Sequence, residues 1–317
     1  MKQTLGNQRG MALLLVLVVV ALLSALLTEL AFSTLVDLRL AETFRDSTRA
    51  AYLAKGGVRV GRALLQEDRN GWDHESEFWG IGVAGYPVGD GDITVTIEDQ
   101  DGKFNLNRLV VGGVADNVFK QRCNKLFLEL GLPDPEDLTA ALIDWIDADD
   151  IVYTDPQTGA TGAEESYYQG LKNPTRCKNA PFDSLEELAG IRGFTPEVRT
   201  ALKGLITVYG VRQLNVNTAP KAVLYAWYGW SSPALDDTIA DTIFEARKTT
   251  PIKNKDDLIA LIGTDNFTIL NQQSDIAYGS TTFHIDSFAR VNDGAGARRV
   301  EAMIGKTGDK LLYLKVN

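Results

Sequence analysis

Seven carboxylates crowd into one short part of this chain, and they are the side chains best suited to chemistry. No lysine or arginine lies between Lys125 and Lys172, so the local sequence offers no basic side chain to offset them. Carboxylates at such density repel one another unless a cation joins them, and Ca²⁺ accepts six to eight oxygen ligands in flexible geometry. We therefore predict one or two Ca²⁺ ions here. The run contains Asp144 and the expected ligands Asp147, Asp149, Asp150, Asp155, Glu164 and Glu165.

Other uses of these carboxylates are less well supported. The spacing is not that of an EF-hand, and Zn²⁺ would require histidine or thiolate ligands that the run lacks. A solvated acidic loop without an ion remains an alternative. Asp144 and Asp147 could form an acid/base pair in principle, but the sequence has no Ser/His/Asp set, zinc motif or phosphate loop. We therefore expect no enzymatic activity. A second acidic group, at 98–102, is typical of a turn.

The acidic run requires a helix and a flexible return to bring its carboxylates together. Pro133 and Pro135 predict a helix over 134–147, which would carry Asp144 and Asp147 near its end. The glycines within 159–162 would let the chain turn back. The acidic run thus lies in a mostly helical region of about 180 residues. The predicted helices there span 115–131, 134–147, 184–190, 196–206, 219–229, 233–248, 255–262 and 266–272.

Strand patterns flank this helical region on both sides. Alternation of apolar and polar residues predicts a strand over 92–98, and three more over 282–291, 298–304 and 311–316. Short turns join the last three, which favours an antiparallel meander. The fold class expected is α+β: a long N-terminal helix on an antiparallel sheet that a large all-α insertion interrupts.

Cys123 and Cys177 are the only cysteines in the chain. A single pair in an exported protein usually forms one disulfide. We predict a disulfide between them if the chain is exported, and two buried free thiols if it is cytosolic.

The N-terminus combines a short basic leader with an apolar run. Residues 1–9 carry Lys2 and Arg9, whereas residues 11–28 carry no charge and could span about 27 Å as a helix. Gly10 stands between them, so a cut after Gly10 would retain the apolar helix. This order is typical of a type IV pilin-like precursor; a plain signal anchor is the alternative. The basic leader favours a cytoplasmic N-terminus, and the apolar pattern continues as one helix to about residue 66.

The inserted region contains a weak internal repeat and a helix-hairpin-helix pattern. FNLN at 104–107 resembles LNVN at 214–217, and each is followed by helices. The segment 184–206 resembles a helix-hairpin-helix unit, which in some proteins binds DNA phosphates. A competence-type pilin that binds DNA is therefore an alternative function. The net charge of −10 opposes it, because attraction to phosphate dominates such binding. We expect no nucleic acid partner.

Four motifs together resemble the minor pseudopilin K family of type II secretion. They are QRGMALLLVLVVVALLSAL at 8–26, DWIDADD at 144–150, GAEESYY at 162–168 and LNVNTAPKAVL at 214–224. The resemblance implies a leader (1–10), a transmembrane helix (11–30), a pilin-like domain in two parts (31–103 and 279–317) and a helical insertion with helix-hairpin-helix or SAM-like units (104–278). It also implies calcium binding, although the extra stretch 151–160 leaves the exact ligands open.

The resemblance also implies processing, location and partners. The prepilin peptidase would cut after Gly10 and methylate the new N-terminus at Met11. The mature chain would be a single-pass inner-membrane protein with a periplasmic C-terminal domain. Pilins usually have glutamate at the fifth mature position, where this chain has Leu15. Its absence is typical of the K family and fits the tip of the pseudopilus. The implied partners are the minor pseudopilins I, J and H and the inner-membrane secretion platform, and the implied role is initiating or capping assembly for export across the outer membrane.

Overall fold

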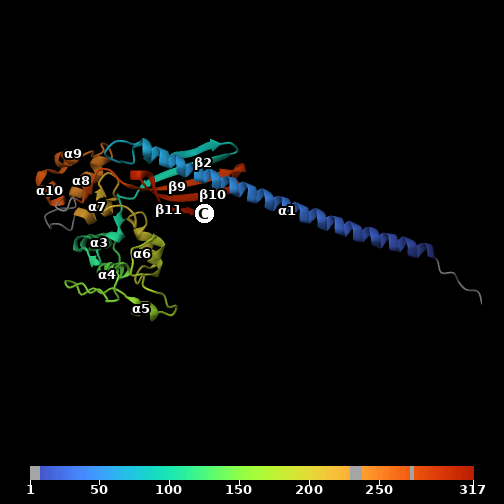
Figure 1. Cartoon of the computed structure of the whole chain (residues 1–317), viewed down its shortest axis with the longest axis horizontal. Coiled ribbons are helices and arrows are strands. Elements are labelled where there is room, and N and C mark those ends of the chain that lie inside the picture. Colours follow the sequence, from blue (N-terminus) through green and yellow to red (C-terminus); the bar gives the residue numbers. More distant parts are fainter. Residues whose placement is uncertain (1–7, 229–237, 272–274) are drawn as a thin grey trace, which may run out of the picture.

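The longest element of the protein is one continuous N-terminal helix. The computed structural model describes residues 8–228, 238–271 and 275–317, and helix α1 covers Gln8–Glu67 (Figure 1). Its 60 residues correspond to about 90 Å of helix. The helix predicted from about 11 to 66 is therefore confirmed. Lys2, in the basic leader, lies outside the described residues.

The first half of α1 makes no contact with the globular part of the protein (Figure 1). Its apolar side chains are exposed from Met11 onward, and the exposed apolar surface continues into the second half of α1 as far as Phe44. Within the described part of the chain, α1 is the one helix long and apolar enough to cross a membrane by length and composition. This surface needs an apolar environment, which a bilayer provides for its first 20 or so residues.

The second half of α1 packs on a five-stranded antiparallel sheet. The strand order is β1-β2-β9-β10-β11, and all four strands predicted from the sequence belong to it. Strand β1, an edge strand, was not predicted because Gly85 and Pro87 interrupt its alternation of apolar and polar residues. The strands are β1 (Val83–Val88), β2 (Gly91–Asp99), β9 (Thr282–Val291), β10 (Gly296–Gly305) and β11 (Lys310–Val316).

Two glycines on α1 let the helix approach the sheet closely. A Cβ atom on Gly57 would lie 2.1 Å from the Ser287 Oγ atom, and one on Gly61 would lie 2.8 Å from Ile285 Cγ2. Ser287 and Ile285 lie on β9 and are fully buried. The neighbouring Gly56, by contrast, has no atom within 4 Å of its Cβ position. Gly57 and Gly61 are therefore required for packing, whereas Gly56 is not.

The chain leaves the sheet after β2 and returns to it at β9, and most of the helices lie between these strands. The predicted helices are found near their expected bounds, except that 184–190 forms a 3-10 helix. The predicted residues 229, 233–237 and 272 lie outside the described ranges. The elements are β3 (Phe104–Asn105), η1 (Leu106–Arg108), β4 (Val110–Val111), β5 (Val114–Ala115), α3 (Asn117–Glu129), α4 (Pro135–Ile146), α5 (Glu165–Gln169), η2 (Leu185–Gly190), α6 (Pro196–Leu202), β6 (Ile206–Thr207), β7 (Leu214–Asn215), α7 (Lys221–Tyr228), α8 (Thr238–Arg247), α9 (Lys255–Ile262), α10 (Thr264–Leu270) and β8 (Ile276–Ala277).

Three short elements complete the fold. Helix α2 (Phe78–Ile81) follows α1, and the 3-10 helices η3 (Asn292–Gly294) and η4 (Thr307–Asp309) form the turns of the C-terminal meander.

The buried apolar side chains form two separate clusters. One joins α1 to the sheet and includes Ala54, Val95 and Ile285. The other fills the helical region between residues 104 and 270, around Phe119 and Trp227. The fold is therefore α+β, as predicted, with a separate apolar core in each part.

A buried polar network joins the two parts where the chain crosses between them. The Asp99 Oδ2 atom, at the end of β2, accepts hydrogen bonds from Asn215 Nδ2 (3.1 Å) and Ser280 Oγ (2.6 Å). The Asp101 Oδ2 atom accepts one from the Thr281 backbone N–H (2.6 Å). Burial raises the pKa of Asp99 to about 7. These bonds tie both crossing points to the insertion.

Replacing Gly57 with leucine should destabilise the fold, because the new side chain would enter the space of Ser287 and force the helix off the sheet. We expect a loss of about 3 kcal/mol or more in the free energy of unfolding. The matched variant Gly56→Leu should be neutral or gain up to about 1 kcal/mol from better helix propensity. Urea unfolding of both variants in detergent, followed by circular dichroism, checks this; equal effects would contradict it.

Candidate cation site

Three acidic side chains from the predicted run converge on one point. Asp144 lies on α4, Asp147 directly follows this helix, and Glu164 is the N-cap of α5. One carboxylate oxygen from each lies within 4.8 Å of the other two. The exposed fraction is 0% for Asp144 and 1% for Glu164, and Asp147 is half-buried. The fold therefore takes three like charges out of water and holds them together.

One oxygen atom of each of these carboxylates has no hydrogen-bond partner. The three buried oxygens are Asp144 Oδ2, Asp147 Oδ1 and Glu164 Oε1. The second oxygen of Asp144 accepts a bond from the Tyr153 backbone N–H (2.8 Å), and Glu164 Oε2 accepts one from the Glu165 N–H (3.2 Å). Unsatisfied buried oxygens are costly. A cation bound between the three carboxylates would offer such oxygens a partner, and hard oxygen donors suit Ca²⁺.

The same crowding raises the pKa of all three groups. Burial raises the pKa of Asp144 to about 6 and that of Asp147 to about 7, in Asp147 with help from the charges of Asp144 and Asp149. Burial and the charge of Asp144 raise the pKa of Glu164 to about 7. Without a cation, the site resists full ionisation at neutral pH. A divalent ion would supply the missing positive charge.

A glycine makes the close approach of the returning chain possible. A Cβ atom on Gly162 would lie 2.1 Å from Asp144 Oδ2. The Gly162 N–H donates to the Tyr153 carbonyl (2.9 Å), and an isolated bridge joins Thr154 to Thr161. This closed turn carries Glu164 back to the end of α4, as the glycines in 159–162 predict.

The structure places four of the predicted ligands elsewhere. Asp155 is buried in an ion pair with Lys120, with 2.5 Å between Nζ and Oδ2. Glu165 Oε2 accepts the Cys177 N–H (2.8 Å). Asp149 Oδ1 accepts the backbone N–H of Ile151 (2.8 Å), and Asp150 Oδ1 accepts Nδ2 of Asn179 (2.9 Å).

Of the six predicted ligands, the structure thus brings only Asp147 and Glu164 together. It adds Asp144, which the expected ligand set omitted. The available signal was its position: Asp144 belongs to the same acidic run and lies three residues before Asp147, in the last turn of the helix that Asp147 follows.

The cysteines do not form the predicted disulfide. Cys123 and Cys177 are both buried free thiols. The physical reason is that they contact different turns of α4: Cys123 lies by the Thr139 side chain, and the Cys177 Sγ atom donates to the Asp144 carbonyl (3.5 Å). Burial raises the pKa of each thiol to about 12, so both are neutral.

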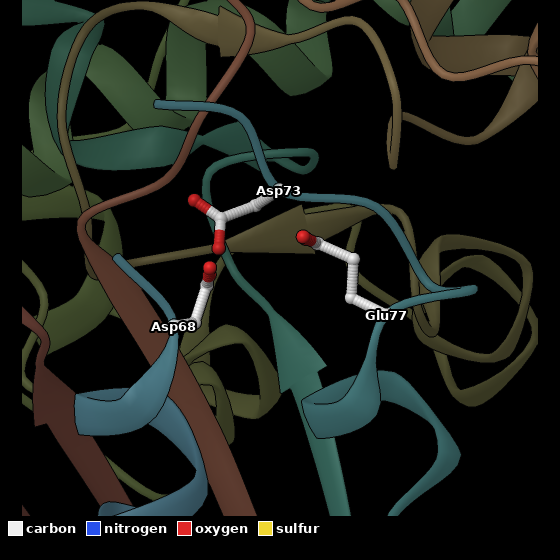
Figure 2. A group of neighbouring side chains, drawn as sticks. All are labelled: Asp68, Asp73 and Glu77. Atoms are coloured by element: carbon white, nitrogen blue, oxygen red, sulfur yellow. The ribbon is translucent and has the colours of Figure 1, made fainter. Parts of the chain in front are cut away.

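Another cluster of three acidic side chains, which the sequence did not indicate, lies near a lysine side chain. Figure 2 shows the side chains of Asp68, Asp73 and Glu77 converging just beyond the end of α1. The Lys306 Nζ atom lies 2.7 Å from Asp68 Oδ2 and 2.8 Å from Asp73 Oδ1. Glu77 accepts hydrogen bonds from the His74 N–H and the Trp79 indole. All three carboxylates therefore have partners, and Lys306 supplies a positive charge to two of them.

The predicted processing residues lie in the first half of α1, whose side chains are exposed. Met11 and Leu15 are 72% and 64% exposed, and no atom lies within 4 Å of a Cβ position on Gly10. Cleavage after Gly10 and methylation at Met11 remain predictions.

Family models and relatives agree on one assignment. Two models, both described as type II secretion system (T2SS) protein K, match residues 102–211 and 214–276. A Pseudomonas aeruginosa type II secretion system protein K is 28% identical over 300 residues, which are 91% of this chain and 86% of that one. The Aeromonas hydrophila protein of the same name is 26% identical over 328 residues, covering 98% and 96%.

A solved structure shares the fold. It is a chain of the GspK–GspI–GspJ complex from the enterotoxigenic Escherichia coli type 2 secretion system, with a TM-score of 0.67 and 22% identity. The similarity covers 90% of this chain and 99% of that one. A long N-terminal helix packs on an antiparallel sheet, and a helical insertion separates two strands of that sheet along the chain. This architecture is that of a pilin-like protein. The chain belongs to the type II secretion system protein K family, one of the families of minor pseudopilins.

Without divalent cations, the stability of the protein should fall as pH rises from about 5 to about 8. The folded pKa values of about 6 and 7 lie above the ordinary carboxyl value, so the folded chain holds protons that the unfolded chain has lost. This stabilisation is complete at low pH and disappears as pH passes through the folded pKa values. Thermal unfolding in EDTA across this range measures the slope.

The control for this prediction is the double variant Asp147→Asn, Glu164→Gln. It should flatten part of the slope, because the raised pKa values of Asp73 and Asp99 are present in both proteins. Identical slopes for the two proteins would contradict the prediction.

Proposed function

We propose that this chain is the minor pseudopilin at the tip of the type II secretion pseudopilus. There it would initiate or cap assembly with the minor pseudopilins I, J and H and so help to drive protein export across the outer membrane. The observation that carries the proposal is the similarity over nearly the whole chain to a protein solved within a GspK–GspI–GspJ complex. The role is one of assembly, with no catalysis.

The shape of the molecule supports a terminal position. The inserted helices lie around the end of α1 that is farthest from the N-terminus (Figure 1). A subunit stacked above would have to occupy this space, so the insertion would block continued growth on that side. Leu15 agrees with this position: a tip subunit has no neighbour above it whose charged N-terminus a glutamate there would pair with, and an unpaired carboxylate in hydrocarbon is costly.

The N-terminal half of α1 supports insertion in the inner membrane. We propose that the prepilin peptidase cleaves after Gly10 and methylates Met11, with Lys2 and Arg9 on the cytoplasmic side and the folded part in the periplasm. The exposed apolar helix would then anchor the subunit beside the inner-membrane secretion platform until assembly withdraws it.

We further propose that Asp144, Asp147 and Glu164 bind Ca²⁺. Their three orphaned oxygens support this directly, since each needs a partner that the described chain does not supply. Carboxylate ligands without a nearby imidazole favour calcium over zinc. Any remaining coordination positions would be filled by water or backbone carbonyls.

Calcium should raise the melting temperature of the protein relative to EDTA, because only the folded chain assembles the three ligands. Glu164→Gln should remove most of this shift by deleting one charged ligand. Asp150→Asn, a change at an exposed carboxylate of the same run, should retain it. Differential scanning calorimetry of the three proteins checks this. A shift lost equally in both variants would point to general charge repulsion in place of a defined site.

Full-length protein should form a stable complex with pseudopilins I and J when the three are co-expressed and purified in detergent. Size-exclusion chromatography with light scattering would measure its stoichiometry. The major pseudopilin of the same system is the control, and it should not replace either partner. Failure to recover a complex would contradict the tip proposal while leaving family membership intact.

A further inference from the structure

Helix α1 covers only part of the sheet on which it packs. On β10, the side chains of Val300, Ala302 and Ile304 belong to the core under α1 and are at most 1% exposed. The residues opposite them on the edge strand β11 lie on the same face of the sheet, yet they are 45–47% exposed. These residues are Leu311, Leu314 and Val316. We call them the apolar strip of β11.

The space over this strip matches the width of one helix. Helix α1 lies over β9, which its glycines Gly57 and Gly61 approach closely. Adjacent strands are about 4.8 Å apart, so β11, two strands from β9, lies about 10 Å to the side. Packed helices have their axes about 8–10 Å apart. A second helix packed beside α1 would therefore lie over β11 and cover the apolar strip.

On the other side of α1, the chain itself supplies a helix. The one-turn helix α2 contacts both α1 and β2. Its Trp79 is 1% exposed and packs edge-on against Phe283 of β9, with 5.0 Å between the ring centroids. The fold therefore places a helix beside α1 on the β2 side, whereas the apolar strip on the β11 side stays exposed.

Two ion pairs identify the flank of α1 that meets β11. The Arg62 Nε atom donates to Asp309 Oδ1 (2.8 Å), directly before β11. On the opposite flank, Arg49 pairs with Asp90 (2.7 Å), directly before β2. Residues seven apart lie on one side of a helix, because 3.6 residues make one turn. Lys55, seven residues before Arg62, therefore lies on the β11 flank.

Basic side chains border the apolar strip. Lys55 and Arg59 are exposed on α1. Arg298 is also exposed, and it lies on the α1 face of β10 because it is opposite the core residue Ala289 of β9. None of the three basic residues forms a salt bridge within the described part of the chain. Because the whole chain has a net charge of −10, this local excess of positive charge favours an acidic partner.

The exposed apolar surface of α1 leads up to the strip. Phe44 is 75% exposed and lies eleven residues, or about three turns, before Lys55 on the same flank. A helix that runs beside α1 would contact Phe44 first and the apolar strip next. Lipid would not reach the strip if residues 11–30 span the bilayer, since Lys55 is about 37 Å beyond Leu30 along the helix.

We propose that the apolar strip of β11 and the adjacent flank of α1 bind one helix of a neighbouring pseudopilin. That helix is amphipathic: its apolar side packs on Leu314 and Val316, and acidic residues face Lys55, Arg59 and Arg298. The inference rests on the proposed assembly with pseudopilins I and J. It adds the surface, the side of α1 and the chemistry of the partner helix.

Co-purification of the full-length chain with pseudopilins I and J in detergent tests this. The double variant Leu314→Lys, Val316→Lys should reduce the recovered complex by about tenfold or more, because it places charge in the apolar contact. The matched control is Val111→Lys, Val114→Lys, at exposed valines of the β4–β5 hairpin, and it should leave recovery unchanged. Circular dichroism verifies that both variants keep the helical content of the parent.

A charge reversal tests the acidic character of the partner. Lys55→Glu with Arg298→Glu should weaken the complex by about tenfold. Raising the salt from about 0.1 to about 0.5 M should weaken the parent complex more than that of the variant, because salt screens exposed charges. Equal salt dependence would overturn the charge pairing.

A photo-crosslinking amino acid identifies the occupant. At position 314 it should crosslink to an acidic amphipathic helix of I or J, and at position 86, on the opposite edge strand β1, it should not. A crosslink from position 314 to a second copy of this chain, or to a segment that is not helical, would overturn the proposal.

The outcomes separate this inference from the proposed function. If the parent chain forms the complex and the β11 variant forms it equally well, the assignment of the surface is wrong and the assembly role stands. If the parent forms no complex with I and J, both are wrong.

Discussion

The close contact between α1 and the sheet is the constraint on which the rest of the molecule depends. One helix serves two surroundings: its first half exposes apolar side chains along its whole surface, and its second half is the central element of a protein core. The two glycines that face β9 allow this contact without a gap. Because the helix is continuous, any force or position imposed on its membrane end is transmitted directly to the sheet.

The helical insertion depends on that sheet through polar contacts. Its own apolar core is separate, so burial of apolar surface does not orient it relative to α1. Orientation comes from the carboxylates of Asp99 and Asp101 at the end of β2, which accept hydrogen bonds from Asn215 in the insertion and from Ser280 and Thr281 just before β9. Buried polar bonds of this kind are directional, and they lose much of their energy if one partner shifts. The two parts should therefore move as one body.

The sequence predicted most of the fold because its patterns are local. Alternation at Ile93, Val95 and Ile97 identified β2, and an unbroken helical pattern identified α1. The edge strand β1 was missed because Gly85 and Pro87 interrupt its alternation. The site was predicted only in part: composition located the acidic run, but choosing Asp144 over Asp155 required knowing that Lys120 reaches Asp155 from another helix.

Features that join distant parts of the chain could not be predicted from one sequence. Lys306 and Asp73 are 233 residues apart, and no periodicity links them. The disulfide was wrong for a related reason, since cysteine counting says nothing about which turn of α4 each thiol contacts. The internal repeat was visible in the sequence only as the similarity of FNLN at 104–107 to LNVN at 214–217, because the last asparagine of each motif bonds to residues that lie far along the chain.

The two acidic clusters differ in where their counter-charge comes from, and this has a consequence for when each becomes stable. Asp68 and Asp73 are both paired with Lys306, a cation that belongs to the chain itself. No salt bridge joins Asp144, Asp147 or Glu164 to a lysine or arginine among the described residues, so at the proposed calcium site their counter-charge would come from the surrounding medium. The region at the end of α1 can thus mature in any compartment, whereas the distal edge of the insertion would mature only where free divalent ions are plentiful. Crossing the membrane would then complete the fold as well as relocate it.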